Sequence, residues 1–344
     1  MSDASPLSAK RRLVLRDADD LVRIDLPDAS AHGIPTATPK VDRVDLASWC
    51  VANRTRLREW RCRYGAILLR GFRVGGPEGL RALVLALGDR PMEYAERSSP
   101  RTRVGDGVYT STEYAASQRI LPHCENSYAN QWPRHIAFHC RTPAETGGET
   151  PIVDCRRVLS ALDPAIVAEF LARGVRYVRN YHPGLGLSWR EVFGVDTREE
   201  AEARCRGAGY GFAWSDEGVL RTWRNAPAIV LHPETREPVW FNHAAFFHVA
   251  SLPEDIARGL LARYAPESLP NHTFYGDGGA IDPAVIETIQ RVYRDHAIVF
   301  PWCAEDVLLL DNMLYAHGRA PFTGPRSVLV SMSDPITAAE AIPG

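Results

Sequence analysis

The sequence predicts a mainly β protein with peripheral helices, arranged as a double-sheet jelly roll. Short runs of β-branched and aromatic residues recur along the chain, and turns rich in glycine and proline separate them. Segments with apolar residues at helical spacing lie around these runs. No internal repeat, low-complexity tract or clear linker is visible. We therefore expect one domain over residues 41–344, and a jelly roll rather than a parallel α/β sheet.

The N-terminal part is expected to begin as an arm and to continue into helices packed on a first strand. Residues 1–40 are rich in Pro, Ala, Ser and Asp, and within this arm only residues 21–26 resemble a strand. Residues 45–64 carry apolar side chains at helical spacing, residues 65–71 are an apolar run bounded by glycines, and a second helix is expected over residues 77–88.

The rest of the chain supplies most of the expected strands. We expect strands over residues 108–113, 135–139, 150–154, 228–232, 238–242, 306–312 and 327–332. We expect helices over residues 154–174, 253–264 and 283–296. Residues 179–225 contain Pro183, several glycines, three tryptophans and one charged helical run. Such a long irregular insertion in a β domain is interpreted as a lid over a site.

The composition is that of an ordinary globular protein. Of the 344 residues, 45% are hydrophobic and 24% are charged. No apolar run approaches the roughly 18 residues that a membrane-spanning helix needs. The first ten residues are polar and lack the apolar core of an export signal. We therefore expect a cytoplasmic protein with no membrane partner.

The cysteines and the charge balance argue against several other classes of protein. The seven cysteines form no Cys-x-x-Cys pair and are odd in number, which argues against a disulfide framework and against a structural zinc site. The 40 basic residues are balanced by 42 acidic ones along the whole chain, so a nucleic-acid partner is not expected. The sequence leaves the oligomeric state open, a homo-oligomer included.

Residues 121–128 contain the strongest chemical signal. If residues 120–125 are extended, His123 and Glu125 project from the same strand face and can hold one ion. A third ligand is available in His317, which follows the apolar run 307–310 where a buried strand would end. Two imidazoles and one carboxylate, with the opposite face of the metal open, are the ligand set of non-haem Fe(II) oxygenases.

Such a metal leaves three positions open, two for the 2-keto and C1 carboxylate oxygens of 2-oxoglutarate and one for O2. The C5 carboxylate of 2-oxoglutarate then needs a fixed cation, and the fork of an arginine suits it better than a lysine. Arg326 is the candidate because it begins the strand after His317, and the loop 318–325 can reverse the chain. Thr150 could add a hydroxyl hydrogen bond to the same carboxylate.

Three motifs carry a resemblance to a known family. These are His123-x-Glu125, Gly-Gly-Glu-Thr150, and Asp-Asn312 followed by His317-Gly-Arg and Arg326. Together they resemble the TauD/TfdA superfamily of Fe(II)- and 2-oxoglutarate-dependent oxygenases over roughly residues 60–335. The resemblance implies a double-stranded β-helix, a cupin-like jelly roll. It also implies iron on His123, Glu125 and His317, and 2-oxoglutarate on Thr150 and Arg326.

Further motifs are similar to the SyrP-like subgroup of these enzymes. They are Tyr-x-Glu-Arg97-x-Ser-Pro-Arg101, His-x-Glu-x-Ser-Tyr128 and Trp-Phe-Asn242. Members of this subgroup hydroxylate amino acids, often tethered to a peptidyl carrier protein, in the biosynthesis of natural products such as antibiotics. The resemblance therefore implies hydroxylation of an unactivated C–H bond, coupled to decarboxylation of 2-oxoglutarate to succinate and CO2. Desaturation, epoxidation and cyclisation would start from the same iron site and remain open.

One residue departs from the family's best-known member. Taurine dioxygenase has aspartate in the His-x-acid motif, whereas Glu125 is one methylene longer, so taurine is not inferred as the substrate. Related halogenases replace this carboxylate by a small residue that leaves room for chloride. The presence of Glu125 therefore argues against halogenation.

Four residues are candidates for binding the substrate. Arg97 and Arg319 could orient a carboxylate or another polar group of an amino-acid-like substrate, and structural ion pairs are the equally weighted alternative. Asn126 and Asn242 could donate hydrogen bonds to the substrate, although asparagine is also common in turns.

Other histidines and other functions are alternatives to this interpretation. His135 and His139 are interpreted as sheet histidines with structural partners, His243 and His248 as an aromatic wall, and Cys124 as a core residue. A zinc or manganese hydrolase or isomerase on a cupin-like barrel could use the same three ligands, but it leaves Thr150 and Arg326 without a role. A non-catalytic barrel that binds a ligand or partner does not explain a complete metal-ligand set.

Overall fold

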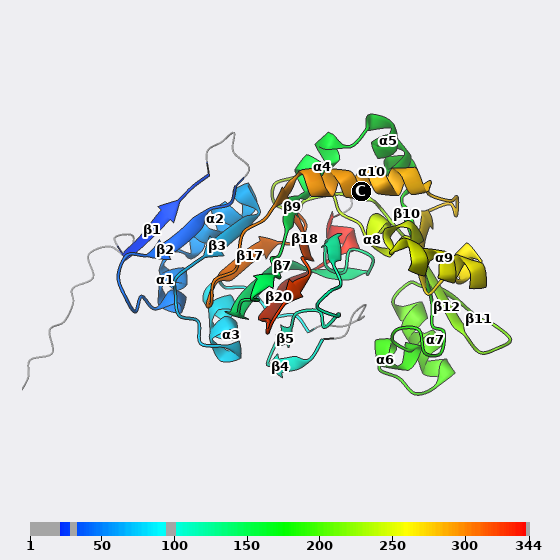
Figure 1. Cartoon of the computed structure of the whole chain (residues 1–344), viewed down its shortest axis with the longest axis horizontal. Coiled ribbons are helices and arrows are strands. Elements are labelled where there is room, and N and C mark those ends of the chain that lie inside the picture. Colours follow the sequence, from blue (N-terminus) through cyan, green and yellow to red (C-terminus); the bar gives the residue numbers. More distant parts are fainter. Residues whose placement is uncertain (1–20, 28–32, 94–100, 342–344) are drawn as a thin grey trace, which may run out of the picture.

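Two β-sheets packed face to face form the body of the protein in the computed structural model, which describes residues 21–27, 33–93 and 101–341 (Figure 1). The larger sheet has eight strands. In spatial order they are β1 (Val22–Asp25), β2 (Thr36–Pro39), β3 (Ala66–Leu69), β17 (Val307–Asp311), β7 (Gln131–Thr142), β20 (Ser327–Thr337), β5 (Val108–Thr110) and β4 (Arg103–Gly105). The smaller sheet consists of β16 (Ala297–Ile298), β9 (Ile152–Asp154), β18 (Tyr315–Arg319) and β6 (Ile120–His123). The mainly β jelly roll expected from the sequence is confirmed.

The main core lies between these two sheets, and a second core lies on the outer face of the larger sheet. Leu308 and Leu310 of β17 point into the first core, whereas Val307 and Leu309 point into the second. Three helices cover the second core or border it: α1 (Leu46–Ala52), α2 (Arg54–Tyr64) and α3 (Pro77–Ala86). Because β17 is buried on both faces, its sequence is a continuous apolar run rather than an alternating one.

The N-terminal strand expected over residues 21–26 is confirmed as β1, and the first expected helix needs a correction. β1 pairs antiparallel with β2, and β2 pairs in parallel with β3 at the edge of the larger sheet. Residues 1–20 lie outside the described residues. The single helix expected over 45–64 is divided at Asn53, whose side chain donates to the carbonyl of Trp49 at 3.0 Å and whose backbone leaves the helical region.

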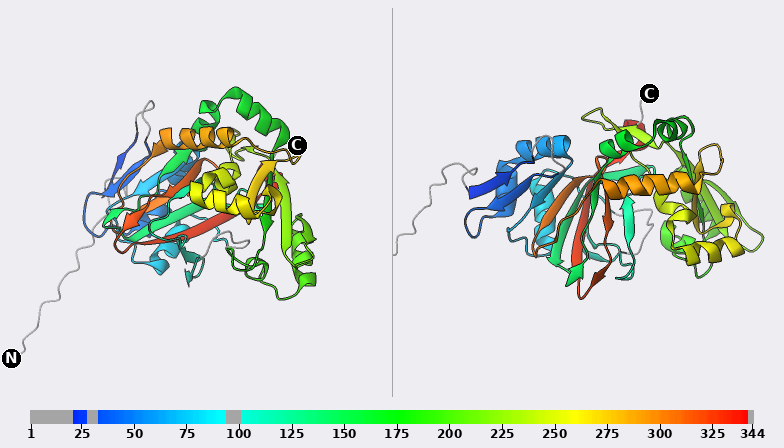
Figure 2. Two further views of the ribbon diagram at one scale, coloured as in Figure 1. Left: turned by 45° about the vertical axis from the view of Figure 1, so that its right-hand side comes forward. Right: turned by 45° about the horizontal axis from the view of Figure 1, so that its top comes forward.

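A second lobe carries a four-stranded sheet of its own (Figure 2). Its strands are, in spatial order, β11 (Gly211–Trp214), β12 (Leu220–Ala226), β10 (Val175–Asn180) and β15 (Asn271–Tyr275). Helices α6 (Trp189–Phe193) and α7 (Arg198–Gly207) join β10 to β11, and each begins with a capping box. Residues 179–225 are therefore regular structure with a small core, not the irregular insertion that the sequence indicated.

The remaining elements lie around these sheets. The helices are α4 (Cys155–Ala161), α5 (Pro164–Arg173), α8 (Ala244–Phe247), α9 (Glu254–Arg263), α10 (Pro283–Asp295) and α11 (Ala338–Ala341), with short 3-10 turns at Val249–Ser251 and Pro266–Ser268. The small pairs are β8 (Thr146–Gly147) with β19 (Phe322–Thr323), and β13 (Ile229–Leu231) with β14 (Pro238–Trp240). The hairpin expected at 228–242 is confirmed, whereas the single helix expected over 154–174 is two helices.

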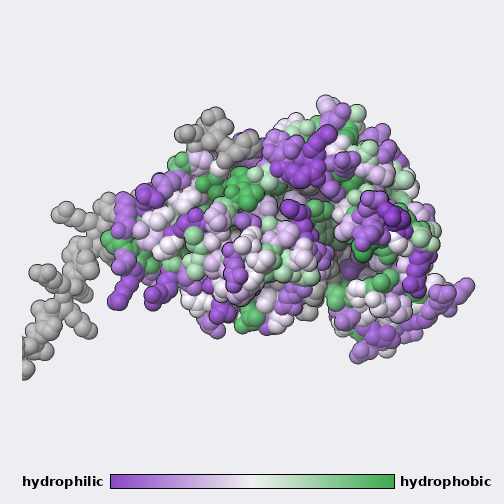
Figure 3. Space-filling view, in the orientation of Figure 1, coloured by the Kyte–Doolittle hydropathy of each residue, from purple (hydrophilic) through white to green (hydrophobic). Residues whose placement is uncertain are grey.

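Hydrophilic and hydrophobic side chains are interspersed on the face drawn in Figure 3. Across the described ranges, none of the helices is both long enough and apolar enough to span a bilayer. All seven cysteines are free thiols, and Cys124 is fully buried, as expected.

Candidate metal centre

Three side chains meet in a buried cluster: those of His123, Glu125 and His317. One potential ligand atom of each lies within 4.8 Å of the others. The Oε2 atom of Glu125 is 4.0 Å from Nε2 of His123 and 3.9 Å from Nε2 of His317. The three residues are 8%, 2% and 4% exposed. Two imidazole nitrogens and one carboxylate oxygen facing a common point fit one divalent metal ion.

Strand pairing brings the two histidines together. β6 and β18 are antiparallel neighbours in the smaller sheet, and His123 lies directly opposite His317. Gly318 makes this close pairing possible, because a Cβ at that position would lie 2.6 Å from the carbonyl oxygen of Ile120. The sequence did not identify Tyr315–Arg319 as a strand, so this pairing emerges only from the fold.

Glu125 reaches the cluster from a turn rather than from a strand. β6 ends at His123, so the expectation of one extended segment over 120–125 is wrong. The turn continues through Asn126, whose φ of 57° lies in the left-handed region that asparagine tolerates. The backbone of Glu125 is held by the side chain of Asn312, at the end of β17. The carboxylate therefore converges with both imidazoles, as expected, but by a different backbone path.

Both imidazoles are prepared for ligation. Nδ1 of His123 donates to the carbonyl oxygen of Leu121 at 2.9 Å, which leaves the lone pair on Nε2. Burial lowers the pKa of His123 and lowers the pKa of His317 still further. The His317 ring packs against Phe138 with centroids 5.0 Å apart. Neutral imidazoles are the form that binds a metal, so the electrostatics of the cluster agree with its geometry.

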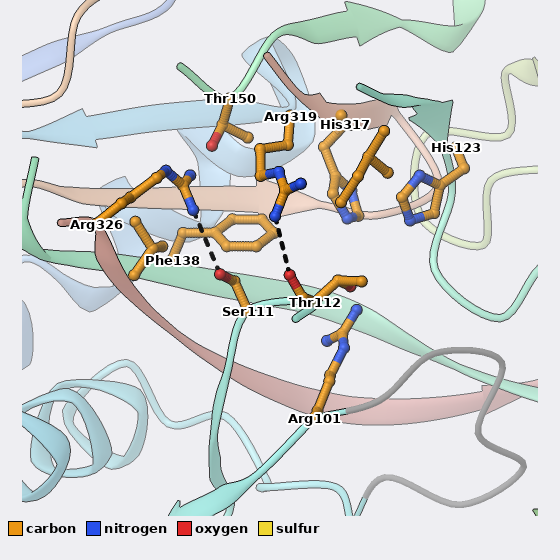
Figure 4. A pocket seen from close by; sticks show the side chains of 12 residues that line it. Arg101, Ser111, Thr112, His123, Phe138, Thr150, His317, Arg319 and Arg326 are labelled. Carbon is orange, nitrogen blue, oxygen red and sulfur yellow. Dashed lines mark hydrogen bonds between the residues drawn. The ribbon is translucent and has the colours of Figure 1, made fainter. Parts of the chain in front are cut away.

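A pocket adjoins the cluster (Figure 4). Its lining residues come from both sheets and from the loop before β6. They are Arg101, Ser111, Thr112, Ile120, His123, Phe138, Thr150, His317, Gly318, Arg319, Arg326 and Val328. The pocket therefore contains both histidine ligands and both residues expected to bind 2-oxoglutarate.

Arg326 presents a partly buried cation to this pocket. Its Nε donates to the carbonyl oxygen of Gly148 at 2.9 Å, and its Nη1 lies 3.4 Å from the hydroxyl of Ser111. Burial and the nearby Arg319 lower the pKa of Arg326 to about 10. Among the described residues no carboxylate forms an ion pair with it. A guanidinium without a carboxylate partner can bind an incoming carboxylate, whose negative charge would balance the positive charge of the arginine.

Thr150 lies in the same pocket and keeps a donor available. Its Oγ1 accepts a hydrogen bond from Nε1 of Trp302 at 3.1 Å, so its hydroxyl hydrogen remains for another acceptor. The preceding glycines are required by packing. A Cβ on Gly147 would lie 2.2 Å from the carbonyl oxygen of Pro321, and one on Gly148 would lie 3.0 Å from Arg326.

Arg319 also lines the pocket, but its hydrogen bonds favour a structural role. Both of its Nη atoms donate to backbone carbonyl oxygens of the segment that precedes β6. The acceptors are Thr112 at 3.2 Å, Tyr114 at 3.1 Å, Ala115 at 2.7 Å and Gln118 at 2.9 Å. A substrate contact through these nitrogens would require their release, so Arg319 is not carried into the proposed substrate site. Arg97, the other expected substrate arginine, lies outside the described residues.

The two candidate asparagines are likewise engaged with the chain itself. The Asn126 side chain is buried and its Oδ1 accepts from the hydroxyl of Tyr128 at 3.2 Å. Asn242 donates through Nδ2 to the carbonyl oxygen of Ala228 and accepts through Oδ1 from the N–H of Ala244, both at 3.0 Å. These contacts favour turn stabilisation over substrate binding for both residues.

A second group of potential metal ligands is an ion-pair network instead. Nδ1 of His135 lies 3.0 Å from Asp334 and 3.5 Å from Asp89. Arg61 already binds both oxygens of Asp89, at 2.6 and 2.9 Å. His135 is thus a sheet histidine with structural partners, as expected. His139 is fully buried in β7, and its Nε2 lies 3.7 Å from Oε1 of Glu305, so it too has a structural partner in the sheet.

His243 and His248, which follow β14, pack against other aromatic rings, in agreement with the aromatic wall expected from the sequence. Nδ1 of His243 is 2.6 Å from the hydroxyl of Ser127, and its ring centroid is 5.4 Å from that of His123. Phe246 packs on His123 with centroids 4.5 Å apart. His248 packs against His272, with centroids 4.4 Å apart, on the side of the second lobe.

Two residues of this region escaped the sequence analysis. Arg101 was noted only as part of a motif, yet its Nη2 donates to Oε2 of Glu125 at 2.6 Å. Asn312 was noted only as a strand end, yet it binds the backbone of Glu125. The two contacts join residues that are 24 and 187 positions apart, so the periodicity of a strand or helix could not indicate them. The motif Ser-Pro-Arg101 was the one signal available.

Comparisons with known proteins agree with this site. The family model "Taurine catabolism dioxygenase TauD, TfdA family" matches residues 30–332. The dapdiamide synthesis protein DdaC of Enterobacter agglomerans is 40% identical over 272 residues, which are 79% of this chain and 83% of that protein. The clavaminate synthase-like protein At3g21360 of Arabidopsis thaliana is 29% identical over 280 residues, covering 78% and 81%.

Solved structures share the fold. PvcB of Pseudomonas aeruginosa superposes with a TM-score of 0.55 at 16% identity, over 94% of each chain. A taurine dioxygenase of Burkholderia xenovorans gives a TM-score of 0.51 at 16% identity, over 94% of this chain and 95% of that one. The family match spans most of the chain and includes all three clustered ligands. The chain therefore belongs to the TauD/TfdA dioxygenase family, and it is an oxidoreductase that uses Fe(II), 2-oxoglutarate and O2.

Proposed function

We propose that this protein hydroxylates an unactivated C–H bond of an amino acid or an amino-acid-derived compound in natural-product biosynthesis. His123, Glu125 and His317 would hold the iron, and Arg326 and Thr150 would hold 2-oxoglutarate. One observation carries this assignment: the two histidines of a complete set of metal ligands line one pocket with a guanidinium that has no carboxylate partner among the described residues. A hydrolase or isomerase would have no use for that arginine.

Each residue has a defined task in this proposal. His123 and His317 supply neutral nitrogen donors, and Glu125 supplies one negative charge. Arg326 and the hydroxyl of Thr150 orient the C5 carboxylate of 2-oxoglutarate. The bound iron supplies the oxidising chemistry, in which 2-oxoglutarate and O2 yield succinate, CO2 and a hydroxylated product, with one oxygen atom in succinate and the other in the product. Burial of the ligands limits access of water and other reductants.

An aromatic cavity near the cluster is the proposed substrate site. It is bounded by both the body and the second lobe. Its lining residues are Tyr128, Tyr177, Arg179, Tyr181, Val192, Phe193, Tyr210, Thr222 and Phe247. Phe247 packs on Phe246, and Phe246 packs on His123, so a chain of packed aromatic rings runs from the cavity to the metal ligands. The proposed lid function of residues 179–225 rests on this arrangement.

The relatives support the substrate class at this coarse level. The relative from Enterobacter agglomerans is named for dapdiamide synthesis, which supports a role in natural-product biosynthesis. A substrate tethered to a peptidyl carrier protein and a free amino acid are both compatible with the proposal. Desaturation, epoxidation and cyclisation are the alternative outcomes, and the mass of the product distinguishes loss of two hydrogens from gain of one oxygen.

The decisive experiment is an anaerobic absorption titration of the metal-free protein with Fe(II) and then 2-oxoglutarate. We expect a weak metal-to-ligand charge-transfer band only when both are present. In Arg326→Ala the band should require at least about tenfold more 2-oxoglutarate, because a charge-assisted bidentate contact is lost. Arg141→Ala, at the exposed end of β7, is the matched control and should titrate like wild type. Absence of the band in wild type, or equal titration of Arg326→Ala, would contradict the assignment.

A further inference from the structure

The sheet of the second lobe has a pocket on the face that the proposed function does not use. Strands β10 and β12 are antiparallel neighbours, and the side chains of each strand alternate between the two faces of the sheet. Tyr177 and Thr222 line the aromatic cavity proposed for the substrate. Val178 and Trp223, one position further along each strand, line a separate pocket on the opposite face of this sheet (Figure 2). The pocket is therefore distinct from that cavity and from the iron site.

The floor of this outer pocket is apolar. Val178 of β10 and Phe274 of the neighbouring β15 are each 6% exposed. Trp223 lies directly opposite Val178 on β12 and is half-buried. A concave surface of aromatic and aliphatic side chains favours an apolar ligand group, above all a planar ring that can pack on Trp223.

Arg221 presents a fixed cation at one end of this floor. Its Nε donates to Oδ1 of Asn180 and its Nη2 to the hydroxyl of Ser268, both at 3.0 Å. Both acceptors are uncharged, and no carboxylate of the described residues forms an ion pair with Arg221. Asn180 is itself fixed, because it is 5% exposed and donates to the carbonyl oxygens of Glu267 and Leu269 at 2.9 and 2.7 Å. A guanidinium oriented in this way keeps its positive charge for a ligand carboxylate.

Glu267 provides an anion next to this cation. It is the acidic residue among those that line the pocket, and it is exposed. Its backbone carbonyl oxygen binds the same Asn180 side chain that accepts from Arg221, so Asn180 brings the two charged residues together. An α-amino acid carries its carboxylate and its ammonium group on one carbon. It therefore needs a cation and an anion side by side, as this end of the pocket has them.

The other end of the floor is closed by a second arginine, Arg176. Its Nε donates to Oδ1 of Asn225 at 2.9 Å, and its Nη2 donates to the carbonyl oxygen of Gly276 at 2.7 Å. Arg221 lies opposite Asn180, which is four residues beyond Arg176 on β10. The two arginines are thus about 13 Å apart along the strand. The apolar floor fills this interval, which leaves length for a large ligand side chain.

We propose that the outer face of the second lobe is a binding site for an α-amino acid with an aromatic side chain. Arg221 binds the carboxylate of the ligand, Glu267 binds its ammonium group, and its ring packs on Trp223. The site is separate from the iron centre and requires neither metal nor 2-oxoglutarate.

A purely structural role for Arg221 makes a different prediction. If Arg221 only connected β12 to Asn180 and Ser268, its replacement would lower the stability of the protein without changing the selectivity for any ligand. If it binds a carboxylate, its replacement removes the discrimination between ligands with and without that group. Ligand selectivity therefore separates the two roles, whereas stability does not.

The experiment is a calorimetric titration of the metal-free protein with three matched probes. L-Phenylalanine carries both charged groups, 2-phenylethylamine lacks the carboxylate, and 3-phenylpropionate lacks the ammonium group. Wild type should bind L-phenylalanine about tenfold more tightly than 2-phenylethylamine and about fivefold more tightly than 3-phenylpropionate. Arg221→Gln should lose the first preference and keep the second, and Glu267→Gln should show the reverse. Arg291→Gln, at an exposed position of α10, is the matched control and should behave like wild type.

Arg221→Lys keeps the charge and should retain part of the preference for L-phenylalanine over 2-phenylethylamine, which provides a second test if Arg221→Gln does not fold. Failure of wild type to bind L-phenylalanine, or equal affinity for all three probes, would overturn the inference. Both preferences persisting in folded Arg221→Gln and Glu267→Gln would also overturn it, because the amino acid would then be bound elsewhere, the proposed substrate cavity included. None of these outcomes bears on the titration with Fe(II) and 2-oxoglutarate, which tests the proposed function.

Discussion

The side chain of Asn312 binds the backbone of Glu125 through two hydrogen bonds. Its Oδ1 accepts from the N–H of Glu125 at 2.7 Å, and its Nδ2 donates to the carbonyl oxygen of Glu125 at 2.9 Å. The same Nδ2 also donates to the carbonyl oxygen of Pro133 at 2.8 Å. Asn312 follows the last residue of β17 in the larger sheet, so it ties the turn that carries the carboxylate ligand to the opposite layer of the jelly roll.

Replacement of Asn312 by aspartate should therefore weaken metal binding. A carboxylate cannot donate, so the carbonyl oxygens of Glu125 and Pro133 would be left buried without a partner. We expect the free energy of unfolding to fall by about 2–4 kcal/mol and the Co(II) affinity to fall by about 10–100-fold. Urea unfolding and Co(II) titration measure these effects. Asn225→Asp, in the exposed part of β12, is the control that should leave Co(II) affinity unchanged. Unchanged Co(II) affinity in Asn312→Asp would show that the hydrogen bonds from Asn312 to Glu125 are not needed for metal binding.

Arg319 should prove structural when it is replaced by lysine. One ammonium group cannot reach the four carbonyl oxygens that the two Nη atoms of Arg319 bind. We expect Arg319→Lys to lose about 1–3 kcal/mol of unfolding free energy and to become more susceptible to proteolysis within residues 112–118. Arg258→Lys, on the exposed face of α9, is the control for the same chemical change. Wild-type stability combined with a raised KM for the substrate would restore the substrate role first expected from the sequence.

Thr150 should contribute to 2-oxoglutarate binding through its hydroxyl group. Thr150→Val removes the donor and should raise the 2-oxoglutarate concentration at half-saturation by about five- to tenfold. Thr150→Ser keeps the hydroxyl and should bind nearly as wild type does. Because Trp302 donates to Thr150, the valine variant also deprives the indole of its acceptor. Trp302→Phe separates the two effects, and it should leave 2-oxoglutarate binding near the wild-type value. If Thr150→Val bound 2-oxoglutarate as wild type does, the hydroxyl would have no part in the site.

Acid should destabilise the second lobe through a pair of buried histidines. Burial lowers the pKa of His248 to about 4 and that of His272 to about 3, from 6.5. Each Nδ1 accepts a backbone N–H, which requires the neutral ring. Below pH 6.5 the unfolded chain binds protons that the folded protein does not, so stability is present above that pH and is lost as the pH falls toward 4 and 3.

The measurement is urea unfolding of the metal-free protein at pH 7.5, 6 and 5. The slope of unfolding free energy against pH should be smaller in His272→Asn than in wild type, by up to about 1.4 kcal/mol per pH unit. The metal-ligand histidines contribute equally to both proteins, so the difference reports on His272. Parallel slopes in the two proteins would contradict the prediction.

Part of the fold could be predicted because the residues that determine it are close together in the sequence. The apolar run 307–310 identified a doubly buried strand, and the turn between residues 228 and 242 identified a hairpin. Local signals failed where tertiary contacts override them. β18 has little β-branched content and contains a glycine, and it is a strand because β6 and β9 pair with both of its edges. The capping boxes of α6 and α7 were present in the sequence but were interpreted as part of an irregular insertion.

The sequence by itself determined which side chains are available for the chemistry. The spacing of His123 and Glu125, the later His317 and Arg326, and the glycines before Thr150 suffice to indicate the family and its cosubstrates. These motifs are recognisable because metal ligation and carboxylate binding each demand particular residue types at particular distances along the chain.

Only the tertiary structure decided how those side chains meet and what surrounds them. The register of β6 against β18 places His123 opposite His317, and a turn, not a strand, delivers Glu125. Arg101 reaches Glu125 through the fold alone. The physical reason is that strand register, loop closure and the sharing of a buried charge depend on contacts between segments far apart in sequence, and no local pattern records such contacts.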